Sequence, residues 1–199
     1  MNSGSGIHLE DKVEYCVVEH NTCVDNKGNG VWLCNIRNCI VRYNIIRNSG
    51  YRGILLDWDF SMYNLIYGNM VENSGYEGIL IGTPGVPEAK PQYNIIADNL
   101  VKNNGRGTSE SCGINIAGIH NWVGYNVLLN ETGIGRQTYG IAVATGSNTL
   151  IWNYIQPGMV REIYWTDSVQ KECIFVPYQY DDGIYSAYSK EGLSNRARD

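Results

Sequence analysis

Side chains that can perform acid–base chemistry or hold a sugar gather in the first third of this sequence. They comprise an imidazole, two indoles and three carboxylates, namely His8, Glu10, Trp32, Asp57, Trp58 and Asp59. Paired carboxyl groups act as acid and as base or nucleophile in the cleavage of glycosidic bonds. The flat ring of tryptophan suits stacking against the apolar face of a sugar. These residue types therefore predict a carbohydrate site, provided that the fold brings them together.

A repeat of glycine and asparagine indicates how the chain positions these side chains. Its first landmark is a Gly followed by two apolar residues spaced by one, at Gly6, Gly30, Gly53, Gly78, Gly113 and Gly140. Its second landmark is an Asn further along, at Asn21, Asn44, Asn69, Asn99, Asn126 and Asn153. The third position before each Asn and the second position after it are apolar throughout, whereas the second position before it varies. This alternation has the period of a β-strand with one buried face.

The repeats predict an all-β fold, a right-handed single-stranded parallel β-helix (a solenoid) of about seven coils. We expect this β-helix to span residues 4–168 and a C-terminal extension or cap to follow at 169–199. Each coil would pair only with the coils above and below it. The recurring Asn residues would form a ladder of stacked amides inside a turn.

Residues at equivalent positions of successive coils should lie above one another on the outer face of the Gly-led sheet. The second position after each Gly holds His8, Trp32, Leu55, Leu80, Asn115 and Ala142. The fourth position holds Glu10, Cys34, Asp57, Gly82, Ala117 and Ala144. The chemistry is therefore expected to concentrate on the first three coils.

The spacing of the coils sets the distance between the carboxylates. Glu10 and Asp57 lie two coils apart, so their backbones should be ~9–10 Å apart. This is at the upper end of the ~6.5–9.5 Å between the carboxyl groups of inverting glycosidases. Asp57 and Asp59 lie within one coil and should be closer. We expect Asp57 and Asp59 to be the reactive carboxylates, with Glu10 or His8 assisting.

Other side chains of the same face are candidates for holding the sugar. Trp32, between Glu10 and Asp57, would stack on a pyranose ring. The full set of predicted binding residues is Trp32, Trp58, His8, Arg37 and Asn115. An alternative remains open, in which Asp57 and Asp59 only solvate the turn at the end of a strand. The protein would then be a non-catalytic glycan-binding or structural module, as part of a larger surface or phage-type protein.

The stretch Asn44–Asp57 resembles the parallel β-helix repeats of the pectate-lyase-like superfamily, and the resemblance runs from residue 4 to about 166. Members include polysaccharide lyases, glycoside hydrolases, epimerases and phage tailspikes. The resemblance implies a carbohydrate-active protein of the glycoside hydrolase type, whose partner is a polysaccharide or oligosaccharide lying across the outer face of the Gly-led sheet. It also implies an extracellular or periplasmic location for the parent protein.

The segment Gly53–Trp58 is also similar to a stretch of β-helical β-xylosidases, in which the Asp after the strand is the nucleophile. The acid/base Glu of those enzymes lies on the adjacent coil, where this chain has Cys34 and Gly82. A polysaccharide lyase would instead need an Arg or Lys base and usually calcium held by several acidic residues. Since Asp57 and Asp59 are the only acidic cluster here, we rank a lyase below a hydrolase.

Charge and composition bear on partners and cofactors. The net charge of −5 and the lack of a basic stripe argue against nucleic acid, and no apolar run reaches the ~18 residues that span a membrane. Without a Cys-x-x-Cys pair we expect no metal site and no cofactor, with calcium at Asp57 and Asp59 as an alternative. Residues 1–6 lack the features of a signal peptide. The first coil begins without a cap, which predicts self-association through an open β-helix end.

Overall fold

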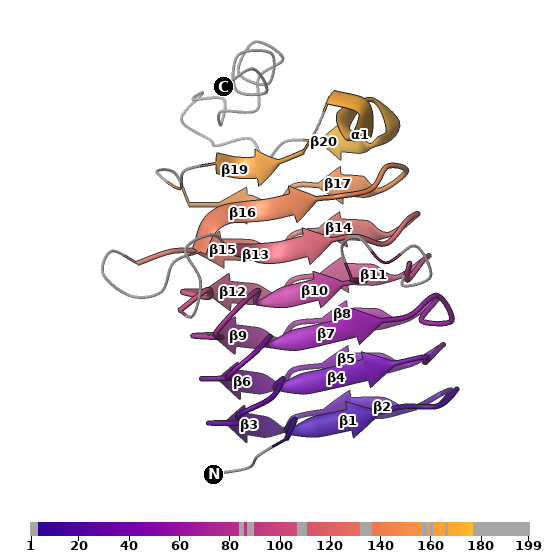
Figure 1. Ribbon diagram of the computed structural model, residues 1–199, viewed down its shortest axis with the longest axis vertical. Coiled ribbons are helices and arrows are strands. Elements are labelled where there is room, and N and C mark those ends of the chain that lie inside the picture. The colour runs from indigo at the N-terminus through magenta and orange to yellow at the C-terminus, as the bar shows by residue number, and fades with distance from the viewer. Residues whose placement is uncertain are drawn as a thin grey trace.

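The computed structural model describes residues 4–83, 86, 90–106, 111–131, 137–156, 159, 161–165 and 167–176. The chain winds into a rod of stacked coils, with its N-terminus at one end (Figure 1). Each regular coil contributes one strand to each of three parallel sheets. The predicted all-β, right-handed parallel β-helix is thereby confirmed.

The three sheets run along the rod and follow the order of the coils. The first sheet contains β1 (Ile7–Leu9), β4 (Val31–Cys34), β7 (Ile54–Asp57), β10 (Ile79–Ile81), β13 (Ser111–Ile116), β16 (Gln137–Val143) and β19 (Arg161–Tyr164). The second contains β2 (Val17–Glu19), β5 (Ile40–Arg42), β8 (Leu65–Tyr67), β11 (Ile95–Ala97), β14 (Trp122–Gly124), β17 (Thr149–Ile151) and β20 (Ile174–Val176). The third contains β3 (Thr22–Val24), β6 (Ile45–Arg47), β9 (Met70–Glu72), β12 (Leu100–Lys102), β15 (Val127–Leu129) and β18 (Tyr154–Ile155).

Strand register follows the Gly landmark. Ile7 pairs with Val31, Val31 with Ile54, and Ile54 with Ile79. Because the register never slips along these strands, equivalent residues of successive coils share a face. The columns read from the sequence are therefore columns in space.

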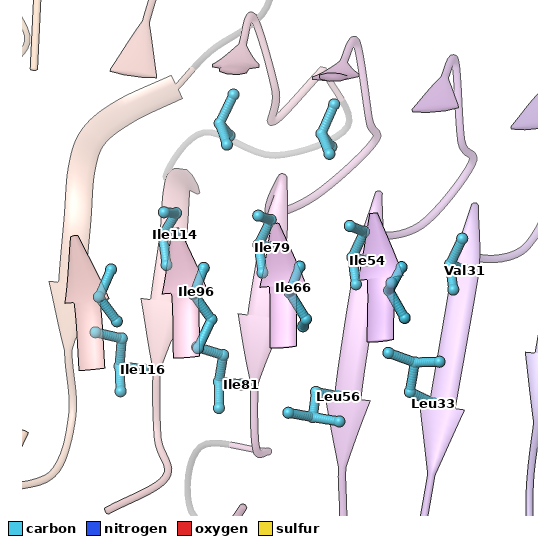
Figure 2. Close-up of a cluster of buried hydrophobic side chains, with 14 of the residues drawn as sticks. Val31, Leu33, Ile54, Leu56, Ile66, Ile79, Ile81, Ile96, Ile114 and Ile116 are labelled. Carbon is cyan, nitrogen blue, oxygen red and sulfur yellow. The ribbon is translucent and has the colours of Figure 1, made fainter. Parts of the chain in front are cut away.

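Inward-facing side chains fill a narrow core along the axis of the rod (Figure 2). Val31, Leu33, Ile54 and Leu56 have no exposed surface. Burying one such side chain contributes about 1.5–3 kcal/mol. The same positions in every coil supply the next layer, so the core is continuous.

The predicted Asn ladder is confirmed and has a regular hydrogen-bonding pattern. The Asn99 Oδ1 atom accepts from the backbone N–H of Asn69 at 2.9 Å and from its side-chain amide at 3.0 Å. The Asn69 side-chain amide also donates to the carbonyl of Val41 at 2.9 Å. Each Asn therefore ties three coils together. A second ladder follows the residues Asn64, Asn94, Asn121 and Asn148.

The C-terminal part contains α1 (Asp167–Glu172) and then β20, which pairs with β17 and so extends the second sheet to Val176. Residues 177–199, most of the predicted extension, lie outside the described part of the chain. The division at residue 168 therefore stays a prediction. In the described part of the chain, no helix is long and apolar enough to span a membrane.

Candidate functional site

An open groove of about 650 Å³ lies on the outer face of β1, β4 and β7. Its walls are formed by Gly4, Ser5, His8, Gly28, Asn29, Trp32, Tyr51, Arg52, Leu55 and Asp57. Three residues that the sequence analysis selected, His8, Trp32 and Asp57, thus line one groove. His8 and Trp32 are register partners on β1 and β4, and Asp57 follows on β7, two residues after the register partner of Trp32.

The rings of His8 and Trp32 are stacked on one another. Their centroids are 4.1 Å apart and their planes differ by 3°. On the other side of Trp32, the next residue of the column is Leu55. The imidazole therefore covers one face of the indole that we expected to hold a sugar. The Trp32 Nε1 atom is buried and has no hydrogen-bond partner among the residues that the structure describes.

Glu10 does not line the groove but approaches His8, which does. Its Oε2 atom lies 3.5 Å from the Nε2 atom of His8. Half of the Glu10 side chain and a third of the His8 side chain are exposed (50% and 33%). The two side chains are therefore close to one another and accessible from solvent.

Asp57 lies at the end of β7 and is half-buried. Its Oδ1 atom accepts hydrogen bonds from the backbone N–H of Trp58 at 2.9 Å and from the hydroxyl of Thr83 at 3.0 Å. Its Oδ2 atom accepts none from the described residues. One carboxylate oxygen thus holds the turn after β7, while the other is available to a ligand in the groove.

Cys34 lies between the two carboxylates and pairs with Asp57 in register. Cys34 does not belong to the hydrophobic cluster along the axis, yet it is only 5% exposed, so its thiol is covered. Burial, followed by the charges of Glu10, Asp57 and Asp11, raises the pKa of the Cys34 thiol to about 11. The thiol is protonated at neutral pH and is a poor nucleophile.

Asp59 and Trp58 follow β7 in the turn and do not line the groove. Trp58 is 43% exposed and has a φ of 69°. Asp59 is exposed. Their roles as reactive carboxylate and binding residue stay predictions.

Arg37 and Asn115 lie away from the groove. The Arg37 Nη2 atom is 2.9 Å from Glu14 Oε1, and its guanidinium lies 5.0 Å from the centre of the Phe60 ring. Asn115 belongs to the His8 column, but the fully buried Leu80 precedes it there. Leu55 and Leu80 continue this column in register, and both are buried. The open part of the column therefore lies on β1 and β4.

Tyr51 and Arg52 were not among the predicted site residues, yet both line the groove. The Arg52 Nε atom lies 3.1 Å from Glu77 Oε2, and the Tyr51 ring stacks on Tyr76 with a centroid distance of 5.7 Å. They come just before the Gly landmark, in the turn that leads into β7. Both precede the Gly of the repeat, whereas the outer-face columns begin after it, so the repeat pattern does not identify them.

A protein family described as periplasmic copper-binding protein (NosD) matches residues 1–189. The chain belongs to the NosD family. No curated protein matches its sequence.

Solved structures similar to this NosD-family chain are also β-helical modules. The A-module of the mannuronan C-5 epimerase AlgE4 from Azotobacter vinelandii has a TM-score of 0.60 and 16% identity, over 81% of this chain and 52% of that one. The A-module of AlgE6 from the same organism has a TM-score of 0.54 and 12% identity, over 89% of this chain and 59% of that one. This chain therefore spans just over half of each module. At these identities the likeness establishes the fold, which agrees with the predicted pectate-lyase-like β-helix.

The family description raises the question of copper. Copper prefers clusters of thiolate, thioether or imidazole ligands. Among the described residues of this NosD-family chain, no three His, Cys, Asp or Glu side chains are arranged to hold a metal ion. The imidazole that lines the groove, His8, contacts the carboxylate of Glu10 and stacks on the ring of Trp32. These residues do not fit a copper centre.

Proposed function

We propose that this protein binds a polysaccharide in the groove over β1, β4 and β7 and hydrolyses it in the manner of a glycoside hydrolase. The observation that carries this proposal is the convergence of a carboxylate, Asp57, with an imidazole and an indole in one open groove. Sugar sites combine an aromatic platform with a small number of directed polar groups. Tyr51 and Arg52 supply further groups of both kinds.

The pair Glu10 and Asp57 is best suited to the chemistry. One residue, Cys34, separates them in their column, so ~9–10 Å lies between their backbones, a separation compatible with inversion. In this proposal Asp57 donates a proton to the leaving oxygen. Glu10, assisted by His8, takes a proton from the water that attacks the opposite face of the sugar. Asp59 is the alternative candidate for the general acid.

Two further observations support a polysaccharide as the ligand and a periplasmic or extracellular location for the protein. The structural neighbours carry names of enzymes that act on mannuronan, which is an analogy of fold only. The NosD family is described as periplasmic, and on that ground we propose a periplasmic or extracellular location for this protein.

A panel of polysaccharides tests the proposal through released reducing ends. We expect turnover of at least one polymer, and a loss of about 10²-fold or more in Asp57→Asn and in Glu10→Gln, since each removes one partner of general acid–base catalysis. Asp98→Asn is the matched control, because Asp98 is an exposed carboxylate of a turn after β11. Turnover that survives both groove substitutions would exclude the proposed pair.

A non-catalytic glycan-binding module is the second candidate function. The observation that favours it is the pair of hydrogen bonds that Asp57 Oδ1 accepts from Trp58 and Thr83, since they make the carboxylate part of the turn. This candidate predicts binding without turnover. It also predicts that Asp57→Asn retains bound glycan, because the amide oxygen can accept the same two bonds.

A further inference from the structure

We infer that the glycan accepted by this groove carries no carboxylate groups, and that an amino-bearing glycan binds more tightly than its neutral counterpart. The inference rests on the proposed function, because it names the chemical class of ligand for the same groove. It follows from which charges near the groove are already paired and which are not.

Every arginine of the first three coils forms an ion pair with a glutamate of a neighbouring coil. The pairs are Arg37 with Glu14, Arg42 with Glu19, Arg47 with Glu72 and Arg52 with Glu77, at distances of 2.9, 2.7, 2.6 and 3.1 Å respectively. Arg52 is the arginine that lines the groove. Its charge is compensated by Glu77, so it offers little net attraction to a carboxylate of a ligand.

The carboxylates near the groove have no such compensation. No Lys or Arg of the described chain lies within ion-pair distance of Asp57, Asp59, Glu10 or Asp11, and Glu10 approaches only His8. The lysines of this part of the chain, Lys12 and Lys27, are exposed and do not line the groove. Among the residues that line the groove, Arg52 is compensated by Glu77, so the carboxylate of Asp57 is the charge that stays uncompensated.

A chain of uronate residues brings a negative charge with every sugar. At physiological ionic strength, charges within about 8 Å still interact, so such a chain is repelled by Asp57 and by the other carboxylates near the groove. Hydroxyl and ammonium groups donate hydrogen bonds to the same carboxylates, and an ammonium group also adds attraction. The preferred order is therefore amino-bearing, then neutral, then carboxylate-bearing.

Three oligosaccharides of equal length test this order by titration calorimetry. A chitosan oligomer and its fully N-acetylated form share one backbone and differ at each amino group, which is a charged ammonium in one and a neutral acetamide in the other, and an oligomannuronate supplies the carboxylates. At low salt and below the pKa of its amino groups, we expect the chitosan oligomer to bind about fivefold or more tightly than the acetylated form. The difference should shrink as salt is added, and oligomannuronate should bind most weakly.

Glu77→Gln tests the role of the arginine directly. It removes the charge that compensates Arg52 and keeps an oxygen for its hydrogen bond, so oligomannuronate affinity should rise about five- to tenfold. Glu19→Gln is the matched control, because it releases Arg42 on the second sheet, away from the groove. It should leave all three affinities unchanged.

The outcomes separate the inference from the proposed function. Binding of oligomannuronate to the unmodified protein as tightly as the neutral oligomer would overturn the inference and leave the carbohydrate groove standing. An unchanged oligomannuronate affinity in Glu77→Gln would equally count against it. If no oligosaccharide binds, or if binding survives Trp32→Ala with Asp57→Asn, the groove itself is not a glycan site and the proposed function fails.

Discussion

The imidazole of His8 lies parallel to the indole of Trp32, with 4.1 Å between the ring centroids. The two residues are 24 positions apart in the chain and occupy neighbouring strands, β1 and β4, in register. In a stack of this kind each ring restricts the orientation of the other. The same imidazole approaches Glu10 at 3.5 Å, so it contacts both the indole of Trp32 and the carboxylate of Glu10.

Two substitutions of His8 should separate these roles. His8→Phe keeps a flat ring against Trp32 but removes the partner of Glu10, so we expect glycan affinity within about threefold of the unmodified protein and turnover reduced by about tenfold or more. His8→Ala removes both contacts and should weaken binding as well. Equal losses of affinity in both variants would show that stacking does not orient Trp32. Calorimetry and a reducing-end assay measure the two quantities.

Breaking the Asn ladder in its interior should destabilise the fold strongly. Asn99 is fully buried and its Oδ1 atom serves both the backbone and the side chain of Asn69. Asn99→Leu leaves these donors unsatisfied, at about 1–3 kcal/mol each, so the free energy of unfolding should fall by about 3 kcal/mol or more. Urea denaturation measures it. Asn21→Ala at the exposed end of the ladder is the control and should cost less than about 1 kcal/mol; similar losses at both sites would refute the ladder's role.

Gly30 should tolerate no side chain, because the coils approach closely there. A Cβ atom at this position would lie 2.2 Å from Ile46 Cγ2 and 2.7 Å from the carbonyl oxygen of Gly53. Gly30→Ala should therefore lower the free energy of unfolding by about 1–3 kcal/mol.

A double-mutant cycle checks the cause of that loss. In the background of Ile46→Ala, which removes the nearer atom, the added cost of Gly30→Ala should be smaller. Strictly additive losses would place the strain elsewhere, for instance at the Gly53 carbonyl.

The Cys34 thiol should be slow to react with alkylating reagents. Its pKa is raised from 9.0 to about 11 by burial first and by Glu10, Asp57 and Asp11 next. Replacing Asp57 by Asn removes one negative charge, so the pKa should fall and the alkylation rate at a fixed pH near 9 should rise. Cys16, which is half-buried, serves as the internal reference. An unchanged rate would mean that burial alone protects the thiol.

The same shift predicts a loss of stability at high pH. Between pH 9.0 and about 11 the unfolded chain releases the Cys34 proton while the folded chain retains it. The unfolded state then binds fewer protons, so the free energy of unfolding falls as the pH rises through this window. Cys34→Ser should reduce that slope in urea titrations at pH 9 and above.

The columns of the β-helix could be read from the sequence alone. Strict alternation around Asn44, Asn69 and their equivalents identified the buried positions, because a strand with one buried face must alternate and identical coils must repeat it. The vertical relationship of Glu10 to Asp57 followed from the same repeat. Side chains that point inward are constrained by the core in every coil, so the pattern carries their positions.

What lies on the outer face was decided by contacts between coils. Trp32 is covered by His8, Leu80 is buried and Arg37 turns to Glu14, and none of these outcomes follows from a column position. Tyr51 and Arg52 enter the groove from a turn that the repeat does not describe. The sequence by itself thus determined the stacking of strands and the inward core, because both depend on a local period. Only the tertiary structure decided which outward side chains meet, because each rotamer depends on neighbours that lie a whole coil away.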